Sequence, residues 1–323
     1  MIVLVTGIDG FVGSHALEYL LSVGGIDIHG THIPGGSTAN IDHCRGRVRL
    51  HEADITDAER IARIFLDVRP DRVIHLAGQA FVPTALRDPI GTFAVNIMGG
   101  VAVLDAARRQ AEATGTPPGV LLVSSGEVYG KLHGEPISED SPVRPENPYA
   151  VSKASVDLIG QEYRRTFGVP VSVVRPFNHA GPRQNPVFVC SDFGRQFALI
   201  AEGKSAPVVR AGNLESRRDF TDVRDVVRAY WAILTHPSPH TVFNLCSGRV
   251  VAIRELIDLF QEASGIRVTV TAEPDRARSG DAPFVAGSYE RLRSATGWRP
   301  EIPLSRTLAD VFAYWREKIR RTP

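Results

Sequence analysis

The chain has 323 residues, enough to bury a large core and to suggest about two domains. Its 43% hydrophobic and 23% charged residues are typical of an ordinary soluble globular protein. The formal net charge of +1 gives no bulk charge to favour nucleic acid or an acidic membrane surface.

The first predicted element is a strand over residues 2–6, an apolar run that is too short for a helix. It leads into Gly7-Ile8-Asp9-Gly10-Phe11-Val12-Gly13 and then an amphipathic helix. Glycines at this point let the backbone turn tightly and approach a pyrophosphate, which then lies at the positive end of the helix. The loop therefore predicts dinucleotide binding, with a plain tight turn as the alternative.

Strands and helices then alternate up to Pro176. Strands are predicted near 26–31, 48–52, 73–77, 120–124 and 171–175, and helices near 57–68, 90–113 and 148–167. This order predicts a parallel sheet with helices on both faces, and ligands collect at the carboxyl ends of such strands. We therefore expect the glycine loop, Ser125 and the helix that carries Tyr149 to meet in one crevice.

The helix at 148–167 carries a pair of side chains with chemical potential. Pro148 suits the first turn of a helix, and Tyr149 and Lys153 are four residues apart on one face. An ammonium beside a phenol lowers the phenol pKa toward neutrality, which gives a proton donor and acceptor for a carbonyl or hydroxyl. The alternative is an ordinary exposed helix with a chance pair.

After Pro176 the alternation breaks. Helices are predicted near 191–202, 223–234, 253–263 and 305–321, and strands near 243–246 and 267–271. The predicted fold class is α/β: a doubly wound Rossmann-type parallel sheet with a smaller, discontinuous C-terminal α/β domain. Cys44, Cys190 and Cys246 form no CxxC pair, and no signal peptide or membrane-length apolar run is evident, so we expect a cytoplasmic protein.

The motifs resemble the extended short-chain dehydrogenase/reductase superfamily, also described as the epimerase/dehydratase family. The resemblance is carried by Gly7-x-x-Gly-x-x-Gly13, Leu76-Ala77-Gly78, Ser125 and Tyr149-x-x-x-Lys153. Residues 175–182, 188–193 and 212–225 are similar to the branch that modifies GDP-mannose. Within it, the similarity is greatest to GDP-4-keto-6-deoxy-D-mannose reductases, which form GDP-D-rhamnose, and next to GDP-mannose 4,6-dehydratases.

The resemblance implies a role for each matching residue. Tyr149 would donate a proton to the C4 keto oxygen, Lys153 would lower its pKa and hold the nicotinamide ribose, and Ser125 would hydrogen-bond the same oxygen. The implied cofactor-binding residues are Gly7, Gly10, Phe11, Val12, Gly13, Asp54, Ile55, Leu76, Ala77, Gly78, Tyr149 and Lys153. The implied substrate-binding residues are Asn178, Val189, Arg218, Arg278 and Asp281, and no metal is expected.

Structural interpretations of these residues stay open. Ser125 is also suited to capping a turn, Asn178 to bonding loop backbone, and Arg218 to a solvated charge pair with Arg217. His179 is interpreted as a structural histidine. The implied division of the chain is 1–176 plus about 219–247 for the NAD(P)-binding domain, and 177–218 plus 248–323 for the sugar-nucleotide-binding domain.

Two features leave alternatives open. Gly30-Thr31-His32 offers neither an acid for a ribose 2′-OH nor an arginine for a 2′-phosphate, so NADP(H) or NAD(H) is expected, with a slight preference for NADPH. Glu127, two residues after Ser125, stands where dehydratases carry an acid–base carboxylate, so a 4,6-dehydratase is the first alternative to a C4 ketoreductase. A non-catalytic nucleotide sensor is a distant one.

The expected partners are a nucleotide sugar, with a GDP-sugar favoured, and a second copy of the chain. Helices 90–113 and 148–167 carry apolar positions on more than one face. In the superfamily the equivalent helices pair across a two-fold axis, so the resemblance implies a homodimer. Neither nucleic acid nor a membrane is expected as a partner.

Overall fold

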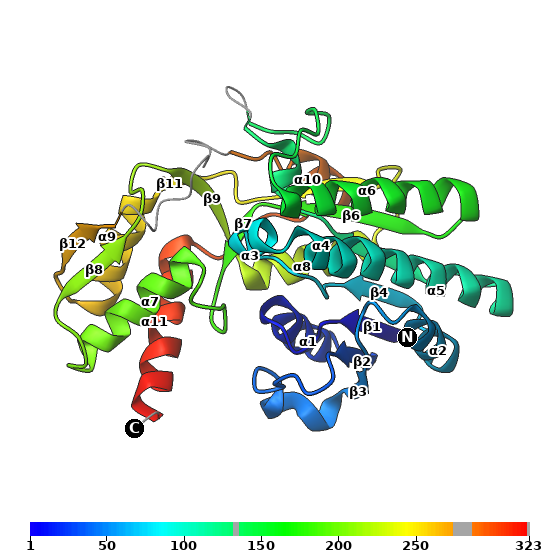
Figure 1. Ribbon diagram of the computed structural model, residues 1–323, viewed down its shortest axis with the longest axis horizontal. Helices are drawn as coiled ribbons and strands as arrows, with labels where there is room; N and C mark the ends of the chain where they lie inside the picture. Colours follow the sequence, from blue (N-terminus) through cyan, green and yellow to red (C-terminus); the bar gives the residue numbers. More distant parts are fainter. Residues whose placement is uncertain (132–135, 274–285, 322–323) are drawn as a thin grey trace.

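The computed structural model describes residues 1–131, 136–273 and 286–321 (Figure 1). Its centre is a seven-stranded sheet in the order β10-β6-β5-β4-β1-β2-β3, with every neighbouring pair parallel. The strands are β1 (Ile2–Thr6), β2 (Asp27–His32), β3 (Arg49–Glu52), β4 (Arg72–His75), β5 (Gly119–Val123), β6 (Val171–Pro176) and β10 (Val242–Leu245). The predicted doubly wound parallel sheet is confirmed.

Helices cover both faces of this sheet. On one face α1 (Phe11–Val23) packs beside α8 (Val223–Thr235), and on the other α2 (Ala58–Val68) and α6 (Pro148–Phe167) flank α5 (Gly99–Thr114). Each face has its own apolar core, with Leu17, Val226 and Tyr230 in one and Phe65, Val103 and Val173 in the other. The inner strands β1 and β5 are buried on both sides, which is why they read as continuous apolar runs.

Side-chain caps set the starts of three of these helices. The Oδ1 of Asp57 accepts the N–H of Arg60 at 2.9 Å, and the Oδ1 of Asn147 accepts the N–H of Ala150 at 2.9 Å. Asp222 begins α8 in the same way. A cap of this kind satisfies a backbone donor that the helix itself leaves open, and contributes about 1 kcal/mol. Local sequence therefore fixes where the Tyr149 helix begins.

The helix predicted at 90–113 is confirmed, with one added feature. It runs through α4 (Pro89–Phe93), a π-helical turn η2 (Ala94–Met98) and α5, and it follows the short α3 (Val82–Arg87). Residues Pro89–Thr114 are long and apolar enough to cross a membrane, but half of the stretch is buried inside the fold. It packs against α2 and α6, as a core helix of the sheet domain does.

A smaller part, on the left of Figure 1, packs around its own core. It contains α7 (Val189–Ala201), α9 (Ile253–Ser264) and α11 (Leu304–Arg321). The helices predicted near 191–202, 253–263 and 305–321 lie here, as does the strand near 267–271, observed as β12 (Thr269–Ala272). Four short strands were not predicted: β7 (Asn178–Ala180), β8 (Val208–Ala211), β9 (Arg217–Asp222) and β11 (Val250–Ala252).

The two parts are joined by several crossings of the chain. α8 and β10 return to the large sheet after α7, and the chain then leaves again into β11 and α9. The short α10 (Glu290–Thr296) comes back once more, because Leu292 and Trp298 pack in the core of the large sheet. The residue boundaries given above for the two domains stay a prediction.

Candidate active site

The glycine loop forms a bare backbone cradle at the start of α1. Gly10 begins this helix without a side-chain cap, so backbone donors of the first turn are left for another partner. A Cβ on Gly13 would lie 2.3 Å from the carbonyl oxygen of Gly7, and one on Gly7 would lie 3.0 Å from the backbone N of Ala77. Gly7 also has φ +67, a conformation that favours glycine. The cradle fits the pyrophosphate of a dinucleotide.

Thr6 ties the end of β1 to the loop after β4. Its Oγ1 accepts the N–H groups of Leu76 and Ala77, both at 3.1 Å, and lies 2.8 Å from His75 Nδ1. Burial lowers the pKa of His75 to about 3, so its ring is neutral. The structure thus brings Leu76 and Ala77 beside the glycine cradle, where the sequence places them.

Asp54 and Ile55, which were also expected near the cofactor, differ in exposure: Asp54 is on the surface and Ile55 is in the core. The exposed Asp54 uses Oδ1 to accept hydrogen bonds from the N–H and Oγ1 of Thr56, at 2.9 and 2.7 Å. Those hydrogen bonds lower its pKa. Ile55 is buried, and a Cβ on Gly99 would lie 2.8 Å from its Cγ2. Ile55 therefore packs against the start of α5.

Asn96 is a site residue that sequence reasoning missed. It lies in the π-helical turn and is 3% exposed. Its Oδ1 accepts the N–H of Gln79 at 2.8 Å, and its Nδ2 donates to the Gln79 carbonyl and to Ser152 Oγ, each at 2.9 Å. Ser152 Oγ in turn donates to the carbonyl of Tyr149 at 2.7 Å. One amide therefore holds the loop after Gly78 against the first turn of α6.

Ser125 and Tyr149 meet at the carboxyl end of β5. Ser125 is 7% exposed and hydrogen-bonds the half-buried Tyr149 side chain. Burial raises the pKa of the Tyr149 phenol to about 12, the Ser125 hydrogen bond opposes this, and the charge of Glu127 adds to it. The expectation that Lys153 brings this pKa toward neutrality is wrong for this structure, because burial outweighs the Ser125 hydrogen bond and the charge of Glu127 adds to the rise.

Lys153 contacts the end of β5 and the loop that follows β4. Its Nζ donates to the carbonyl of Val123 at 2.8 Å, and burial lowers its pKa to about 8. The Nζ would lie 3.8 Å from a Cβ on Gly78. The ammonium therefore lies under the loop that follows β4, on the face of α6 that also carries Tyr149.

Glu127 lies at the rim of this group. Its side chain is exposed, and its Oε2 accepts Asn147 Nδ2 at 3.0 Å. Its backbone N–H donates to Ser125 Oγ at 3.1 Å. Ser125 thus caps the turn η3 (Gly126–Tyr129), as the structural interpretation expected, while it also hydrogen-bonds Tyr149.

A buried polar network anchors the far end of that turn. The hydroxyl of Tyr129 donates to Asn244 Oδ1 at 2.6 Å and accepts Arg175 Nη1 at 2.9 Å. Arg175 also pairs with Asp157 of α6 at 2.7 Å, and both side chains are almost fully buried. The network joins β6, β10, α6 and η3, so it fixes the turn of Ser125 relative to the helix of Tyr149.

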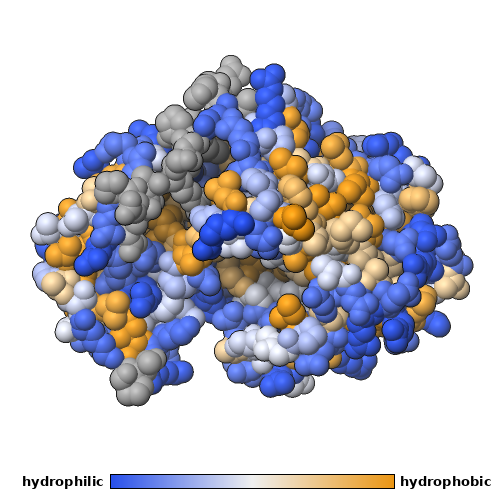
Figure 2. All heavy atoms as spheres, viewed as in Figure 1, coloured by the Kyte–Doolittle hydropathy of each residue, from blue (hydrophilic) through white to orange (hydrophobic). Residues whose placement is uncertain are grey.

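The expected substrate residues lie on the edge of the smaller part. Asn178 is exposed on β7 and pairs with Phe220 of β9, two residues after the half-buried Arg218. Val189 begins α7, next to Phe188, whose ring meets that of Phe81 edge-on at 5.8 Å. Arg278 and Asp281 lie outside the described residues. Figure 2 shows the face hollowed between the two parts.

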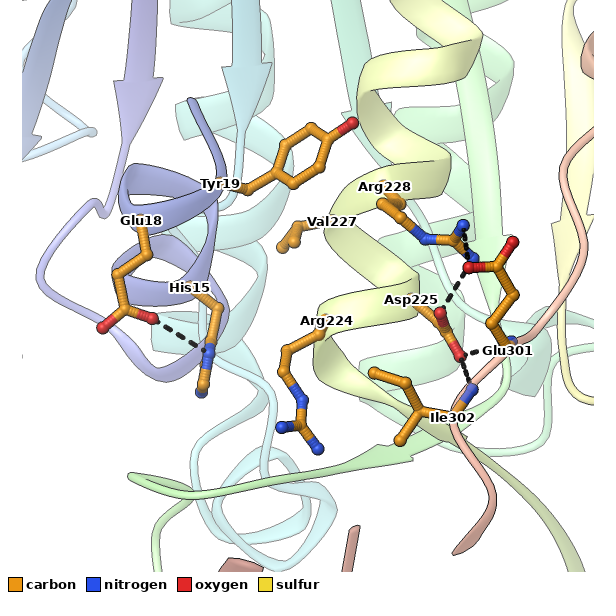
Figure 3. Close-up of a pocket in the computed structure, with 9 residues that line it drawn as sticks. All are labelled: His15, Glu18, Tyr19, Arg224, Asp225, Val227, Arg228, Glu301 and Ile302. Carbon is orange, nitrogen blue, oxygen red and sulfur yellow. Dashed lines mark hydrogen bonds and ion pairs between the residues drawn. The ribbon is translucent and has the colours of Figure 1, made fainter. Parts of the chain in front are cut away.

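Two further features have structural explanations. His179 stacks on Phe11 at 6.0 Å, and its Nδ1 lies 3.1 Å from the carbonyl of Phe177, in keeping with a structural histidine. A pocket of about 330 Å³ between α1 and α8 (Figure 3) contains none of the expected site residues. Its guanidinium groups are already paired, Arg228 with Asp225 and Glu301 at 2.8 and 2.7 Å. Within the described ranges, no cluster of three potential metal ligands occurs.

Comparisons with known proteins agree with this geometry. A family model described as GDP-mannose 4,6 dehydratase matches residues 4–311. GDP-6-deoxy-D-mannose reductase of Pseudomonas aeruginosa is 36% identical, covering 98% of this chain and 97% of the relative. GDP-mannose 4,6-dehydratase of Vibrio cholerae is 27% identical, with 97% and 92% covered.

A solved structure shares the fold over nearly the same length. It is described as RMD from Pseudomonas aeruginosa complexed with NADPH, with a TM-score of 0.83, 35% identity, and coverage of 98% of this chain and 99% of that one. Family model, sequence relatives and fold agree along almost the whole chain. The chain belongs to the GDP-mannose 4,6 dehydratase family, within the extended short-chain dehydrogenase/reductase superfamily.

Proposed function

We propose that the protein is an NAD(P)H-dependent ketoreductase that converts GDP-4-keto-6-deoxy-D-mannose to GDP-D-rhamnose. As a member of its family it is an NAD(P)-dependent oxidoreductase of nucleotide sugars. The observation that carries the proposal is the Ser125–Tyr149 hydrogen bond, formed by a protonated phenol beside a glycine cradle. The similarity to a GDP-6-deoxy-D-mannose reductase supports the substrate.

The side chains divide the work around one carbonyl oxygen. A reduced nicotinamide, when bound, would supply the hydride. Ser125 and Tyr149 each offer a hydroxyl to the carbonyl oxygen, and Tyr149 releases its proton as negative charge develops there. A pKa of about 12 keeps the phenol protonated at neutral pH, which is the form that a reductase needs. Lys153, whose Nζ donates to the carbonyl of Val123 and lies close to Gly78, is assigned to hold the nicotinamide ribose.

Substrate binding is assigned to the rim of the smaller part. Asn178, Val189 and Arg218, with Arg278 and Asp281, are the proposed contacts to the sugar nucleotide. A guanidinium fork suits a diphosphate, because it offers two parallel donors and a permanent charge. The position of Asn178 beside β9, two residues from Arg218, supports a shared role for these two residues.

The first test is turnover. Purified protein given GDP-4-keto-6-deoxy-D-mannose should oxidise NADH or NADPH in a one-to-one ratio with sugar reduced, and Tyr149→Phe should remove the activity. Ser155→Ala is a matched control: its hydroxyl lies on the same helix but donates to the carbonyl of Val151 at 2.9 Å. The nucleotide sensor would be favoured by two results together: wild-type protein does not turn the substrate over, and Tyr149→Phe leaves the biological activity unchanged.

Glu127 keeps a 4,6-dehydratase as the second candidate. Its charge acts on Tyr149, and a dehydratase needs a carboxylate near the sugar to move the C5 proton. Its side chain is exposed and accepts a hydrogen bond from Asn147, the residue that caps α6. Consumption of GDP-mannose without net change in cofactor, lost in Glu127→Gln, would establish the dehydratase.

We also propose that the protein forms a homodimer in the cytoplasm through α4, η2 and α6. Large apolar side chains are exposed there, including Ile90, Met98 and Leu158 at 81%, 57% and 63%. Figure 2 shows apolar residues gathered over these helices, and a patch of this kind marks a contact surface. Light scattering at micromolar concentration should give twice the chain mass, and Leu158→Glu should give the monomer.

A further inference from the structure

A carboxylate lies between the glycine loop and the segment after β2. Asp9 stands between Ile8 and Gly10 and is half-buried. Its Oδ2 would lie 3.7 Å from a Cβ on Gly36, and its carbonyl oxygen accepts Asn40 Nδ2 at 3.0 Å. Asp9 therefore faces residues 36–40 and lies close to the N-terminus of α1.

His32, at the end of β2, faces the same carboxylate. Its Nδ1 is buried and has no hydrogen-bond partner among the described residues. Burial raises the pKa of Asp9, and the charge of His32 opposes that rise. The end of β2, the glycine loop and residues 36–40 thus enclose one site, and the acid in it comes from the glycine loop.

This site lies where the adenosine ribose of a dinucleotide must lie. In doubly wound folds the pyrophosphate occupies the N-terminus of the first helix, and an acid at the end of the second strand accepts the ribose 2′-OH. Here Gly30, Thr31 and His32 provide no acid. Asp9 supplies the missing carboxylate from the neighbouring loop.

The elements around Asp9 lack the cations that a 2′-phosphate would need. The chain contains no lysine or arginine before Arg45, so neither β1, the glycine loop, α1 nor β2 offers a permanent cation. A 2′-phosphate placed near Asp9 would put two like-charged groups together at a half-buried position, which is unfavourable. A free 2′-OH would instead gain an ionised acceptor.

We infer that Asp9 is the residue that selects the cofactor, and that it makes this protein prefer NAD(H) over NADP(H). The slight expectation of NADPH considered the end of β2 alone, and Asp9 reverses it. The relative solved with NADPH does not decide the matter at 35% identity. The inference rests on the dinucleotide chemistry of the proposed function, but binding measured without a sugar nucleotide is independent of which reaction follows.

The test is equilibrium binding of NADH and NADPH to the full-length protein, followed by calorimetry or nicotinamide fluorescence. Wild type should bind NADH at least about tenfold more tightly than NADPH. Asp9→Asn should bind NADPH more tightly than wild type, which reduces the ratio at least about fivefold. Because salt screens charge repulsion, the wild-type ratio should also fall as ionic strength rises.

Asp27→Asn is the matched control, because it removes the same charge from the opposite end of β2, where Asp27 pairs with Arg49 at 3.2 Å. It should leave the ratio unchanged. Asp9→Glu, which keeps the charge, should retain a preference for NADH. If circular dichroism shows that Asp9→Asn is unfolded, Asp9→Ser provides the same comparison. Equal or tighter binding of NADPH by wild type, or an unchanged ratio in the Asp9 variant, overturns the inference.

Discussion

Replacing Asn96 with alanine should separate positioning of the active site from its chemistry. The side chain is 3% exposed and makes three hydrogen bonds, two to Gln79 and one to Ser152. A buried partner left without its hydrogen bond costs about 1–3 kcal/mol. Gln79 is half-buried, so water replaces part of that loss, and we expect about 2–4 kcal/mol less stability in total.

The effect on catalysis follows from what Asn96 holds. Without it, the loop after Gly78 and the first turn of α6, with Tyr149, lose their common support. A misalignment that raises the barrier by about 1.4 kcal/mol lowers kcat tenfold. We expect kcat to fall at least about tenfold and KM for the nucleotide sugar to change little, because the proposed substrate residues lie on other elements.

Urea unfolding and steady-state kinetics on the same preparations measure both effects. Gln110→Ala is the control, since Gln110 is 4% exposed on α5 and donates to the carbonyl of Pro70 at 3.1 Å, away from Tyr149. It should lose stability and keep kcat. If Asn96→Ala keeps its kcat despite lost stability, or if both variants lose kcat alike, the positioning role is refuted.

Three other changes have defined outcomes. Tyr149→Phe should lower kcat at least about 100-fold, because it removes the hydroxyl that donates the proton; a smaller loss would mean that another group donates the proton. Burial lowers the pKa of Lys153 to about 8 from 10.5, so kcat should fall as pH rises through about 8. Between pH 8 and 10.5 the unfolded chain binds the proton that the folded chain has lost, so this lysine makes stability rise with pH. Lys153→Met should abolish that rise in urea titrations, and a retained rise would contradict the assignment. Arg175→Met leaves the buried Asp157 without its charged partner and should cost about 3–5 kcal/mol of stability, whereas an unchanged unfolding midpoint would exclude a structural role.

The features that the sequence predicts well are those with local causes. Asn147 and Pro148 start α6 at the predicted residue, and apolar runs locate the buried strands of the large sheet. β7 was missed because it is short, and β9 because most of its side chains are charged or polar. The two strands also pair over a long separation, as Asn178 does with Phe220. No local periodicity records a contact of that kind.

In the active site, too, features with local causes can be predicted from sequence, and those that depend on tertiary contacts cannot. Spacing alone places Tyr149 and Lys153 on one face of a helix, but the pKa of Tyr149 depends on how deeply the fold buries it. Asn96 had one available signal, a single amide in the apolar stretch 94–98. Its partners, Gln79 and Ser152, are brought to it by the π-helical turn and by α6, which only the tertiary structure reveals.

The central claim is that Tyr149, Ser125 and Lys153 reduce the C4 keto group of a GDP-linked 6-deoxy sugar. The most direct measurement is the reaction of purified wild-type protein with GDP-4-keto-6-deoxy-D-mannose and NADH or NADPH, with products identified by NMR. We predict one equivalent of cofactor oxidised for each GDP-D-rhamnose formed, and no consumption of GDP-mannose supplied alone. Conversion of GDP-mannose to the 4-keto sugar without net oxidation of cofactor would contradict the claim.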